Sequence, residues 1–419
     1  MTMDLSSPSR RTLTIVATAT VGSLAAVPLL GRLTDDGRPD TDSGTLPAPG
    51  TGSSSPDPRA ALAGSGAGVR LTPEAGGVRA TDLDLASLGQ GAGGARARRA
   101  TGAGATDLDT GELDTDTFSM LGVTWQGGAA TVLMRTRSAG TGSWTSWPPL
   151  HGLTDGPDRG TGEGIEGLRA TEATWVGASD GLQVRMVGED LSDLRLSLIQ
   201  PEPDQAAYRT APRPRTSRLR PQIQTRGSWG ADESLRSGSP QYVDSIRQVH
   251  VHHTVSSNSY SAGDVAGLIR GMYRYHTRSL GWSDIGYNFL VDRFGRIWVG
   301  RAGGPAKSVR GAHTLGFNHN STGVSVIGNF ETTKPNRQII KAIARVAAWK
   351  LHQYGRSPRG YTWVRSEGSD RYAYGQRVRL HVIDGHRDTN DTACPGTYLY
   401  KRLYWIRRKT QLRLRQQLG

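Results

Sequence analysis

Two groups of histidine and cysteine residues in the C-terminal half of the chain have side chains that can bind a metal ion. One is His250-Val-His252-His253, and the other is His386 with Cys394 after seven intervening residues. Zinc favours imidazole and thiolate ligands, and a catalytic zinc site has three protein ligands with water in the fourth position. Two histidines and one cysteine satisfy that count, so the sequence predicts a metal site of this composition.

Cys394 is the only cysteine in the 419 residues, so the chain cannot form an internal disulfide. Its thiol can be inert, pair with another chain or bind a metal. The metal explains it best, because a bound thiolate is both protected from oxidation and chemically useful.

Each of these groups lies at the end of a predicted strand. Residues 247–254 and 378–383 are short apolar, β-branched runs typical of buried strands, and residues 323–330 form a third such run. Residues 287–291 and 296–299 flank a turn sequence, Asp-Arg-Phe-Gly, and predict a hairpin.

Helices are predicted between these strands. Ser261-Ala-Gly-Asp264 is a capping box that is followed by apolar residues at helical spacing. A second helix begins at Pro335 and ends at Gly355, and a basic helix follows Pro395. Strands that alternate with covering helices predict an α/β fold, a C-terminal mixed β-sheet covered by helices, over residues 225–419.

The N-terminal half has a different pattern. Residues 31–112 are rich in Gly, Ala, Thr, Pro and Asp and predict a disordered spacer. Residues 113–200 show the alternation of half-buried antiparallel strands and predict a small all-β, sandwich-like accessory domain. Its paired Trp144 and Trp147 either pack in a turn or form a platform for sugar stacking. Residues 201–224 are rich in Pro and Arg and predict a linker.

Residues 1–30 indicate export. Arg10 and Arg11 form a twin-arginine pattern, and an apolar run follows to Leu30. The alternative is a chance arginine pair on a disordered tail. The pattern predicts a secreted protein that carries a twin-arginine signal, and the family resemblance described below implies that it is cell-wall-associated.

The charge of +14 is divided unevenly along the chain. Residues 1–204 hold 16 Arg against 25 Asp and Glu, and residues 205–419 hold 35 Lys and Arg against 12 Asp and Glu. We expect no nucleic-acid partner, because the basic residues are scattered and no nucleic-acid-reading motif is present. An anionic wall polymer explains the basic charge of an exported protein as well as nucleic acid would.

A set of ordered motifs identifies a family that the C-terminal half resembles. The set covers about residues 222–405 and consists of Val251-His-His-Thr254, Asp284-Ile-Gly-Tyr287-Asn-Phe, Gly311-Ala-His313-Thr, Gly328-Asn-Phe330 and His386-Arg-Asp…Ala393-Cys394-Pro395. It resembles the peptidoglycan recognition protein family and its relatives, the type 2 N-acetylmuramoyl-L-alanine amidases. The β-rich segment is similar, more loosely, to the upstream region of exported actinobacterial members.

The resemblance implies roles for particular residues. It selects His252 from its group as the ligand, with His386 and Cys394 completing a Zn²⁺ site. It places the catalytic Tyr287 beside the metal, whereas ordinary core packing is the alternative. Thr392 stands where some relatives carry lysine, and a hydroxyl there can donate to an oxyanion.

Two further residues are predicted to contact substrate. His313 and Asn318 line the cleft or, alternatively, serve only to hold a loop. The resemblance implies an enzyme, expected to be a monomer, that hydrolyses the amide between N-acetylmuramic acid and L-alanine of peptidoglycan. The alternative is a non-catalytic peptidoglycan-binding module, which Cys394 argues against because such members typically lack the cysteine.

Overall fold

The structure is a computed structural model that describes residues 68–88, 105–202 and 218–418. The predicted signal, residues 1–30, lies outside the described residues, as do residues 31–67 of the predicted spacer. None of the helices in the described ranges is long and apolar enough to cross a membrane.

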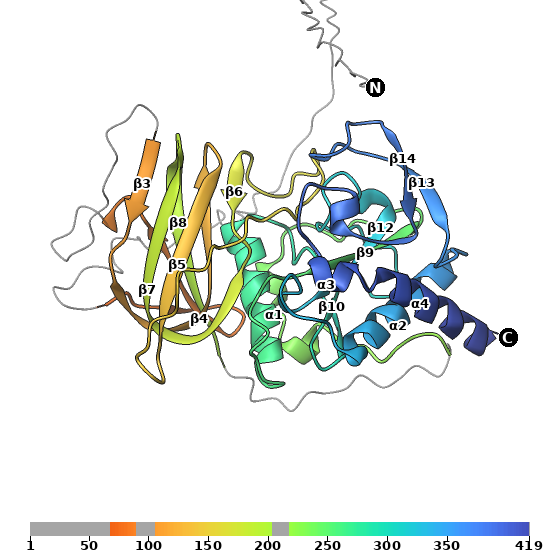
Figure 1. Ribbon diagram of the computed structural model, residues 1–419, viewed down its shortest axis with the longest axis horizontal. Helices are drawn as coiled ribbons and strands as arrows, with labels where there is room; N and C mark the ends of the chain where they lie inside the picture. The colour runs from red at the N-terminus through yellow and green to blue at the C-terminus, as the bar shows by residue number, and fades with distance from the viewer. Residues whose placement is uncertain (1–67, 89–104, 203–217, 419) are drawn as a thin grey trace, which may run out of the picture. The chain divides into compact units, whose positions relative to one another are not determined.

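An all-β domain comes first in the chain (Figure 1). Within its described residues, eight strands pair antiparallel in the order β1-β2-β8-β4-β7-β3, with β5 on β7 and β6 on β4. The strands are β1 (Thr72–Glu74), β2 (Val78–Asp84), β3 (Ala105–Asp109), β4 (Leu113–Gln126), β5 (Ala130–Ser138), β6 (Leu168–Ala170), β7 (Thr174–Glu189) and β8 (Ser192–Pro201). The prediction of an all-β domain is confirmed.

Three of these strands lie where the sequence predicts a spacer. β1, β2 and β3 fall within residues 31–112, so the spacer prediction is wrong for residues 68–88 and 105–112. Val78 and Ala80 alternate towards one core, and Leu83 and Leu85 are also buried. These few apolar residues suffice because β2 pairs along its length with β8, which supplies its hydrogen bonds.

The C-terminal domain is built on a five-stranded mixed sheet in the order β11-β10-β12-β9-β15. Its strands are β9 (Gln248–His253), β10 (Phe289–Val291), β11 (Ile297–Val299), β12 (Ser321–Val326) and β15 (Ile383–Gly385). β10 and β11 form the predicted antiparallel hairpin, and the other neighbours pair in parallel. β13 (Tyr361–Arg365) and β14 (Arg377–His381) form a separate ribbon.

Helices cover this sheet, as predicted. They are α1 (Asp264–Arg274), α2 (Arg337–Gln353), α3 (Thr397–Tyr400) and α4 (Leu403–Leu418). The Asp264 carboxylate accepts from the backbone N–H of Ser261, which is one half of the predicted capping box. Asn336 caps α2 by accepting from the backbone N–H groups of Gln338 and Ile339, so this helix begins just after the predicted Pro335.

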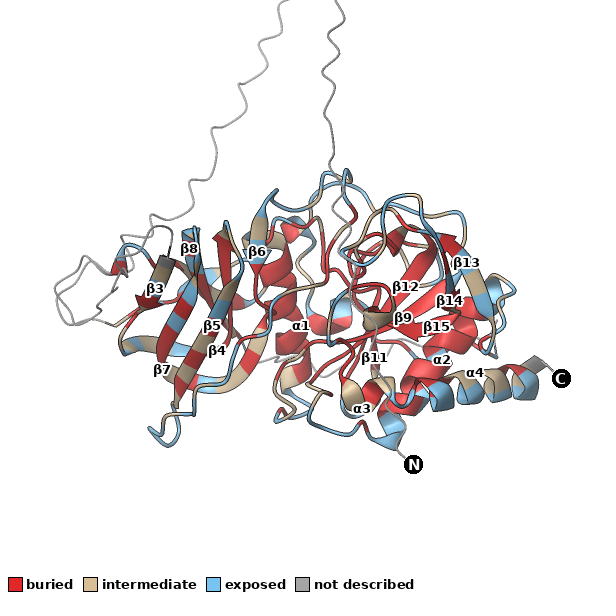
Figure 2. Cartoon of the chain, turned by 45° about the horizontal axis from the view of Figure 1, so that its top comes forward, coloured by how far each residue is buried: buried red, intermediate tan, exposed pale blue. Residues whose placement is uncertain are grey.

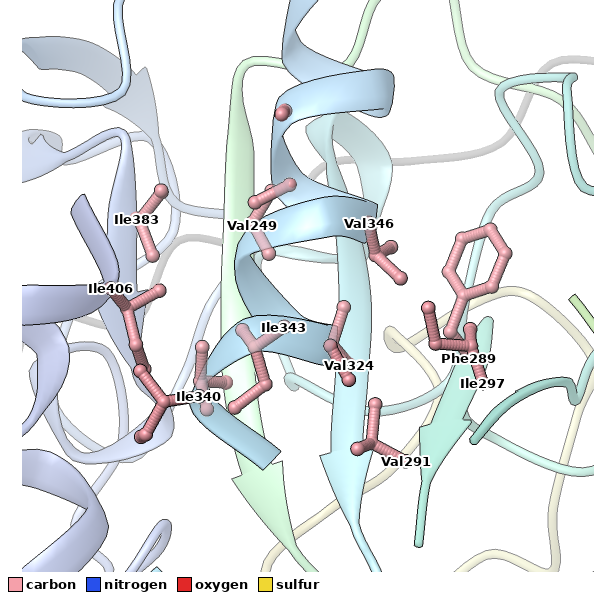
Figure 3. Close-up of a cluster of buried hydrophobic side chains, with 14 of the residues drawn as sticks. Val249, Phe289, Val291, Ile297, Val324, Ile340, Ile343, Val346, Ile383 and Ile406 are labelled. Atoms are coloured by element: carbon pink, nitrogen blue, oxygen red, sulfur yellow. The ribbon is translucent and has the colours of Figure 1, made fainter. Parts of the chain in front are cut away.

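The two faces of the sheet have different environments. Val249 and Val251 of β9 pack beneath α2 and α4 with the residues drawn in Figure 3, among them Val324, Ile343 and Ile406. Because side chains alternate across a strand, His250 and His252 point to the opposite face. β9 and β12 are buried along their whole length (Figure 2).

The other side of the domain packs against the all-β domain. α1 shares one apolar cluster with Val78, Ala80, Met120 and Ile199 of that domain. Tyr275, directly after α1, donates its hydroxyl to backbone carbonyls of Val123 and Thr171 at 3.3 and 3.1 Å. The two domains therefore share a core.

The end of the predicted linker is part of the C-terminal domain. Gln224 pairs with β11 through the backbone of Ile297 and Val299, and Leu219 and Ile223 are buried in the core beneath α2. The linker prediction is wrong for residues 218–224, because these apolar residues add to an edge of the sheet.

Candidate metal centre

The structure brings His252, His386 and Cys394 together, although 142 positions separate the first from the last. His252 lies near the end of β9, and His386 opens a 3₁₀ turn directly after β15. β15 and β9 are adjacent parallel strands, so their carboxyl ends meet at one edge of the sheet. The Cys394 Sγ atom lies 3.7 Å from Nδ1 of His252.

Hydrogen bonds to its backbone and to its sulfur hold Cys394 in place. The Cys394 N–H donates to the Thr392 hydroxyl at 3.1 Å, and its carbonyl accepts from the Arg387 N–H at 3.0 Å. The backbone N–H of His253 donates to the Cys394 sulfur at 3.4 Å. A donor aimed at the sulfur favours the thiolate, the form that binds metals.

A fourth residue joins this cluster from the all-β domain. Asp155 is buried, and its Oδ1 lies 3.2 Å from Nδ1 of His252 and 2.9 Å from Nδ1 of His386. Asp155, His252, His386 and Cys394 each offer one ligand atom, and these four atoms lie within 4.8 Å of one another. The sequence did not predict Asp155.

The arrangement fits a tetrahedral metal site. Zinc-to-ligand bonds of about 2.0–2.3 Å place tetrahedral ligands roughly 3.3–3.6 Å apart. The measured 3.2 and 3.7 Å separations bracket that range, and 2.9 Å is slightly shorter. Among the described residues, no hydrogen bond of acceptable geometry reaches either Asp155 oxygen or either His386 ring nitrogen. Buried polar atoms rarely lack partners, so these atoms suit a shared cation.

Burial sets the protonation of the cluster. Desolvation lowers the pKa of His252 to about 4, despite the nearby Asp155 carboxylate, so its imidazole is neutral at neutral pH. Burial, followed by the charge of Asp155, raises the pKa of the Cys394 thiol well above its usual value. A cation at the centre of the cluster reverses that effect and stabilises the thiolate.

Hydrogen bonds behind the cluster orient His252. Its Nε2 lies 3.2 Å from the Thr314 hydroxyl, which leaves Nδ1 to face the cluster. The Thr314 hydroxyl also lies 2.8 Å from Nδ1 of His313. The Asn318 side-chain carbonyl accepts from the backbone N–H groups of His313 and Thr314, which fixes this loop.

His313 and Asn318, the predicted substrate contacts, are both fully buried. The His313 ring packs against His252, with 5.1 Å between ring centroids. The Asn318 amide donates to the Gly156 carbonyl and the Asp158 carboxylate of the all-β domain. Both residues therefore support the loop in this arrangement, and their contact with substrate stays a prediction.

Tyr287 lies beside the cluster, just before β10. Its ring is buried, and its centroid is 5.8 Å from that of His252. Burial, followed by the charges of Asp155 and Glu172, raises the pKa of its hydroxyl well above the ordinary value. Tyr287 is therefore a neutral hydrogen-bond donor at physiological pH.

Thr392 and His250 have defined partners. The Thr154 hydroxyl of the all-β domain donates to the Thr392 hydroxyl at 3.0 Å. Nδ1 of His250 lies 2.6 Å from the buried Asp384 carboxylate, so this histidine is paired within the sheet rather than turned to the cluster.

Comparison with known proteins places the chain in a family. A family model described as N-acetylmuramoyl-L-alanine amidase matches residues 242–397. Peptidoglycan-recognition protein SC2 of Drosophila simulans is 28% identical over 182 residues, which are 43% of this chain and 84% of that protein. A second peptidoglycan-recognition protein of Drosophila simulans is 30% identical over 182 residues, 43% of this chain and 85% of that protein. The chain belongs to the peptidoglycan recognition protein and type 2 amidase family.

Two further matches complete the comparison. The solved structure of wild-type Drosophila PGRP-LB has 28% sequence identity and a TM-score of 0.34, over 43% of this chain and 92% of that one. A second family model, described as Rv3811 N-terminal galactose-binding domain-like, matches residues 78–218. Most of this match lies in the all-β domain, and it begins at Val78, within the residues that the sequence assigns to a spacer.

Proposed function

We propose that this protein is an exported, zinc-dependent N-acetylmuramoyl-L-alanine amidase that acts on peptidoglycan. The observation that carries the proposal is the convergence of His252, His386 and Cys394 on one point, with the Tyr287 ring packed beside His252. Two imidazoles and one thiolate are a catalytic zinc ligand set, and the amidase family model spans all three residues.

The reaction adds water across an amide bond. The lactyl group of N-acetylmuramic acid leaves as a carboxylic acid, and L-alanine of the stem peptide leaves with a free amino group. Zinc, when bound, acts as a Lewis acid on the amide and activates water. Tyr287 and Thr392 supply the remaining chemistry from this chain.

Tyr287 is suited to hydrogen bonding. Because its hydroxyl stays protonated, it can donate to the oxygen of the amide carbonyl as negative charge develops there. Thr392 carries a second hydroxyl on the loop before Cys394; its oxygen accepts from Thr154 and from the Cys394 N–H, so its own O–H can donate to the same oxygen. Neither residue carries a charge, so their contribution depends on position.

Localisation and partners belong to the same proposal. The twin-arginine pattern of Arg10 and Arg11 and the excess of basic residues in the C-terminal half suit a secreted protein that binds peptidoglycan and anionic wall polymers. We propose that it acts as a monomer.

The decisive experiment digests purified bacterial wall and analyses the products by mass spectrometry. The proposal expects new L-alanine amino termini, no new reducing sugar ends and about one zinc per chain. Cys394→Ala should lose both the zinc and the hydrolysis, whereas Ser257→Ala, at a partly exposed position where the hydroxyl accepts from the Ser259 N–H, should keep both. Hydrolysis that survives in Cys394→Ala would refute the proposed site.

A second candidate is a peptidoglycan-binding protein without catalysis. Asp155 favours it, because a site closed by four protein ligands leaves no position for water. The relatives that the chain matches are also named as recognition proteins. Wall that is bound by the zinc-loaded protein but never cut, even in the Asp155 variants described below, would support this candidate over the amidase.

A further inference from the structure

One loop of the all-β domain covers the metal centre. It connects β5 to β6, and residues 153–166 of it, here called the strap, contact the C-terminal domain at several places. The Thr154 hydroxyl donates to the Thr392 hydroxyl. The Asp158 carboxylate accepts from the Arg310 guanidinium and from the backbone N–H of Gly316. Further along, Glu163 pairs with Arg301, and the Gly164 N–H donates to the Gly281 carbonyl.

Asp155 lies at the centre of these contacts. Its neighbours hold it there, because the Leu153 N–H donates to the Ala170 carbonyl and the Glu172 N–H donates to the His151 carbonyl. These two bonds tie the start of the strap to the strand β6 and the residues that follow it. Asp155 therefore reaches His252 and His386 from a backbone fixed two residues earlier.

The strap leaves no open path to the ligands. The side chains of His252, Asp155 and His386 are at most 2% exposed. A pocket of about 520 Å³ lies beside the strap, lined by Arg159–Thr161, Arg310 and Tyr374 among others, but none of the four cluster residues lines it. Asp158 does not line the pocket either, but its carboxylate pairs with Arg310 of the lining.

We propose that Asp155 is a fourth metal ligand supplied by the all-β domain, and that the strap keeps the amidase latent until it is displaced. The carboxylate takes the position that a catalytic zinc site keeps for water, so the metal is held but cannot act. The strap simultaneously contacts Thr392, on the loop before Cys394, and Asn318, which fixes the loop that carries Thr314. The latency half of this proposal rests on the proposed function, whereas the ligand half does not.

The strap is held by side-chain contacts rather than by regular secondary structure. It has no helix, and positive φ angles at Gly160, Gly162 and Gly164 mark a turn-rich segment. Glu163 and Asp158 hold Arg301 and Arg310 by ion pairs whose carboxylates are at most 12% exposed, so an anion displaces the strap only if it reaches these arginines itself. A wall fragment that carries carboxylates can therefore compete for the arginines as it enters.

The test compares full-length Asp155→Ala and Asp155→Asn with wild type. Asp155→Asn nearly preserves the side-chain volume, which guards against loss of folding, and circular dichroism checks both variants. Glu166→Ala is the matched control, because it removes an exposed carboxylate from the same strap. Cys394→Ala provides the reference for a lost ligand.

Two measurements test whether Asp155 binds the metal, and neither depends on enzymatic activity. Zinc transfer to a colorimetric chelator should be at least about 10-fold faster in both Asp155 variants, as expected for a lost contact at a metal centre. In the Co²⁺-loaded wild type, the visible absorption spectrum should not change between pH 6 and 9. Asp155→Ala should show a transition in that range as a coordinated water deprotonates.

Wall hydrolysis then tests latency. Asp155→Ala should release L-alanine amino termini at least about 10-fold faster than wild type if the closed strap is populated nine times in ten, and Glu166→Ala should match wild type. Wild-type chelator kinetics and spectra in both Asp155 variants would overturn the ligand assignment. If the Asp155 variants show altered zinc transfer and spectra but hydrolyse wall no faster than an active wild type, latency would be overturned. Altered metal properties with no hydrolysis by any form would overturn the amidase and leave Asp155 a ligand.

Discussion

Arg274, the last residue of α1, links the C-terminal domain to two strands of the all-β domain. Its guanidinium donates to both Glu74 oxygens at 2.9 and 2.8 Å and to both Asp82 oxygens at 3.0 and 2.9 Å. The Arg274 side chain is 3% exposed, whereas those of Glu74 and Asp82 are 28% and 35% exposed. We predict that Arg274→Ala weakens the docking of the domain that carries the strap.

The expected loss of unfolding free energy in Arg274→Ala follows from how far the ion pairs are buried. Removing one partner of a fully buried ion pair costs about 3–5 kcal/mol, because the remaining charge stays buried. Here water already reaches about a third of each carboxylate, which reduces the expected loss to about 2 kcal/mol of unfolding free energy.

The pH dependence has a definite sign. Burial raises the pKa of Asp82, but Arg274, together with the Ser197 hydroxyl and Arg195, more than offsets this, so the pKa lies below the ordinary 3.8. A lowered carboxylate pKa stabilises the fold above about pH 4, and this contribution disappears as the pH falls through the folded-state pKa. The difference between wild type and Arg274→Ala should therefore be largest near pH 7 and shrink below pH 4.

Urea titrations at pH 7 and pH 3.5, followed by tryptophan fluorescence, measure both effects. Arg278→Ala is the control, because it removes an exposed arginine one turn further along the same segment. A loss below about 0.5 kcal/mol at pH 7, equal to that of Arg278→Ala, is the range of an ordinary surface substitution and would refute the reasoning.

Two further predictions concern the metal centre. Tyr287→Phe should lower kcat for wall hydrolysis by about 100-fold at unchanged zinc content, because one positioned donor is lost. Tyr260→Phe is the control, since it removes a buried hydroxyl that is bonded to the Ile327 carbonyl. This control should leave kcat nearly unchanged. Removing the metal with a chelator should make the Gly160–Gly164 turn more sensitive to limited proteolysis, because Asp155 loses its partner, and added zinc should restore protection. Equal cleavage with and without zinc would contradict this.

The C-terminal fold could be predicted well from the sequence. The strands and helices that carry the ligands follow clear signals, such as the β-branched run around Val249 and Val251 and the caps of α1 and α2. The all-β domain was predicted only from residue 113 onward. β2 was missed because it lies in a Gly- and Asp-rich region and gains its stability from β8, more than a hundred residues away.

The three candidate ligands of the site could be proposed from the sequence, whereas the fourth residue of the cluster, Asp155, could not. His252, His386 and Cys394 could be proposed because few residue types bind zinc and because family motifs surround them. Thr314, which orients His252, had a signal, since it directly follows His313 within a quoted motif. Glu172 and Asp155 had no signal in the sequence that marked them as part of the site. A single acidic residue in a polar segment resembles many solvent-exposed carboxylates.

Asp155 shows why a ligand motif alone does not define the state of a metal site. The motif residues come from β9 and the segment after β15, and they determine which metal can bind. Whether water reaches that metal depends on a loop from another domain, whose position relies on the shared core around α1 and Tyr275. The same three ligands therefore suit either a catalytic or a closed site, and in this chain the choice between them lies with the strap, since Asp155 competes with water for one position.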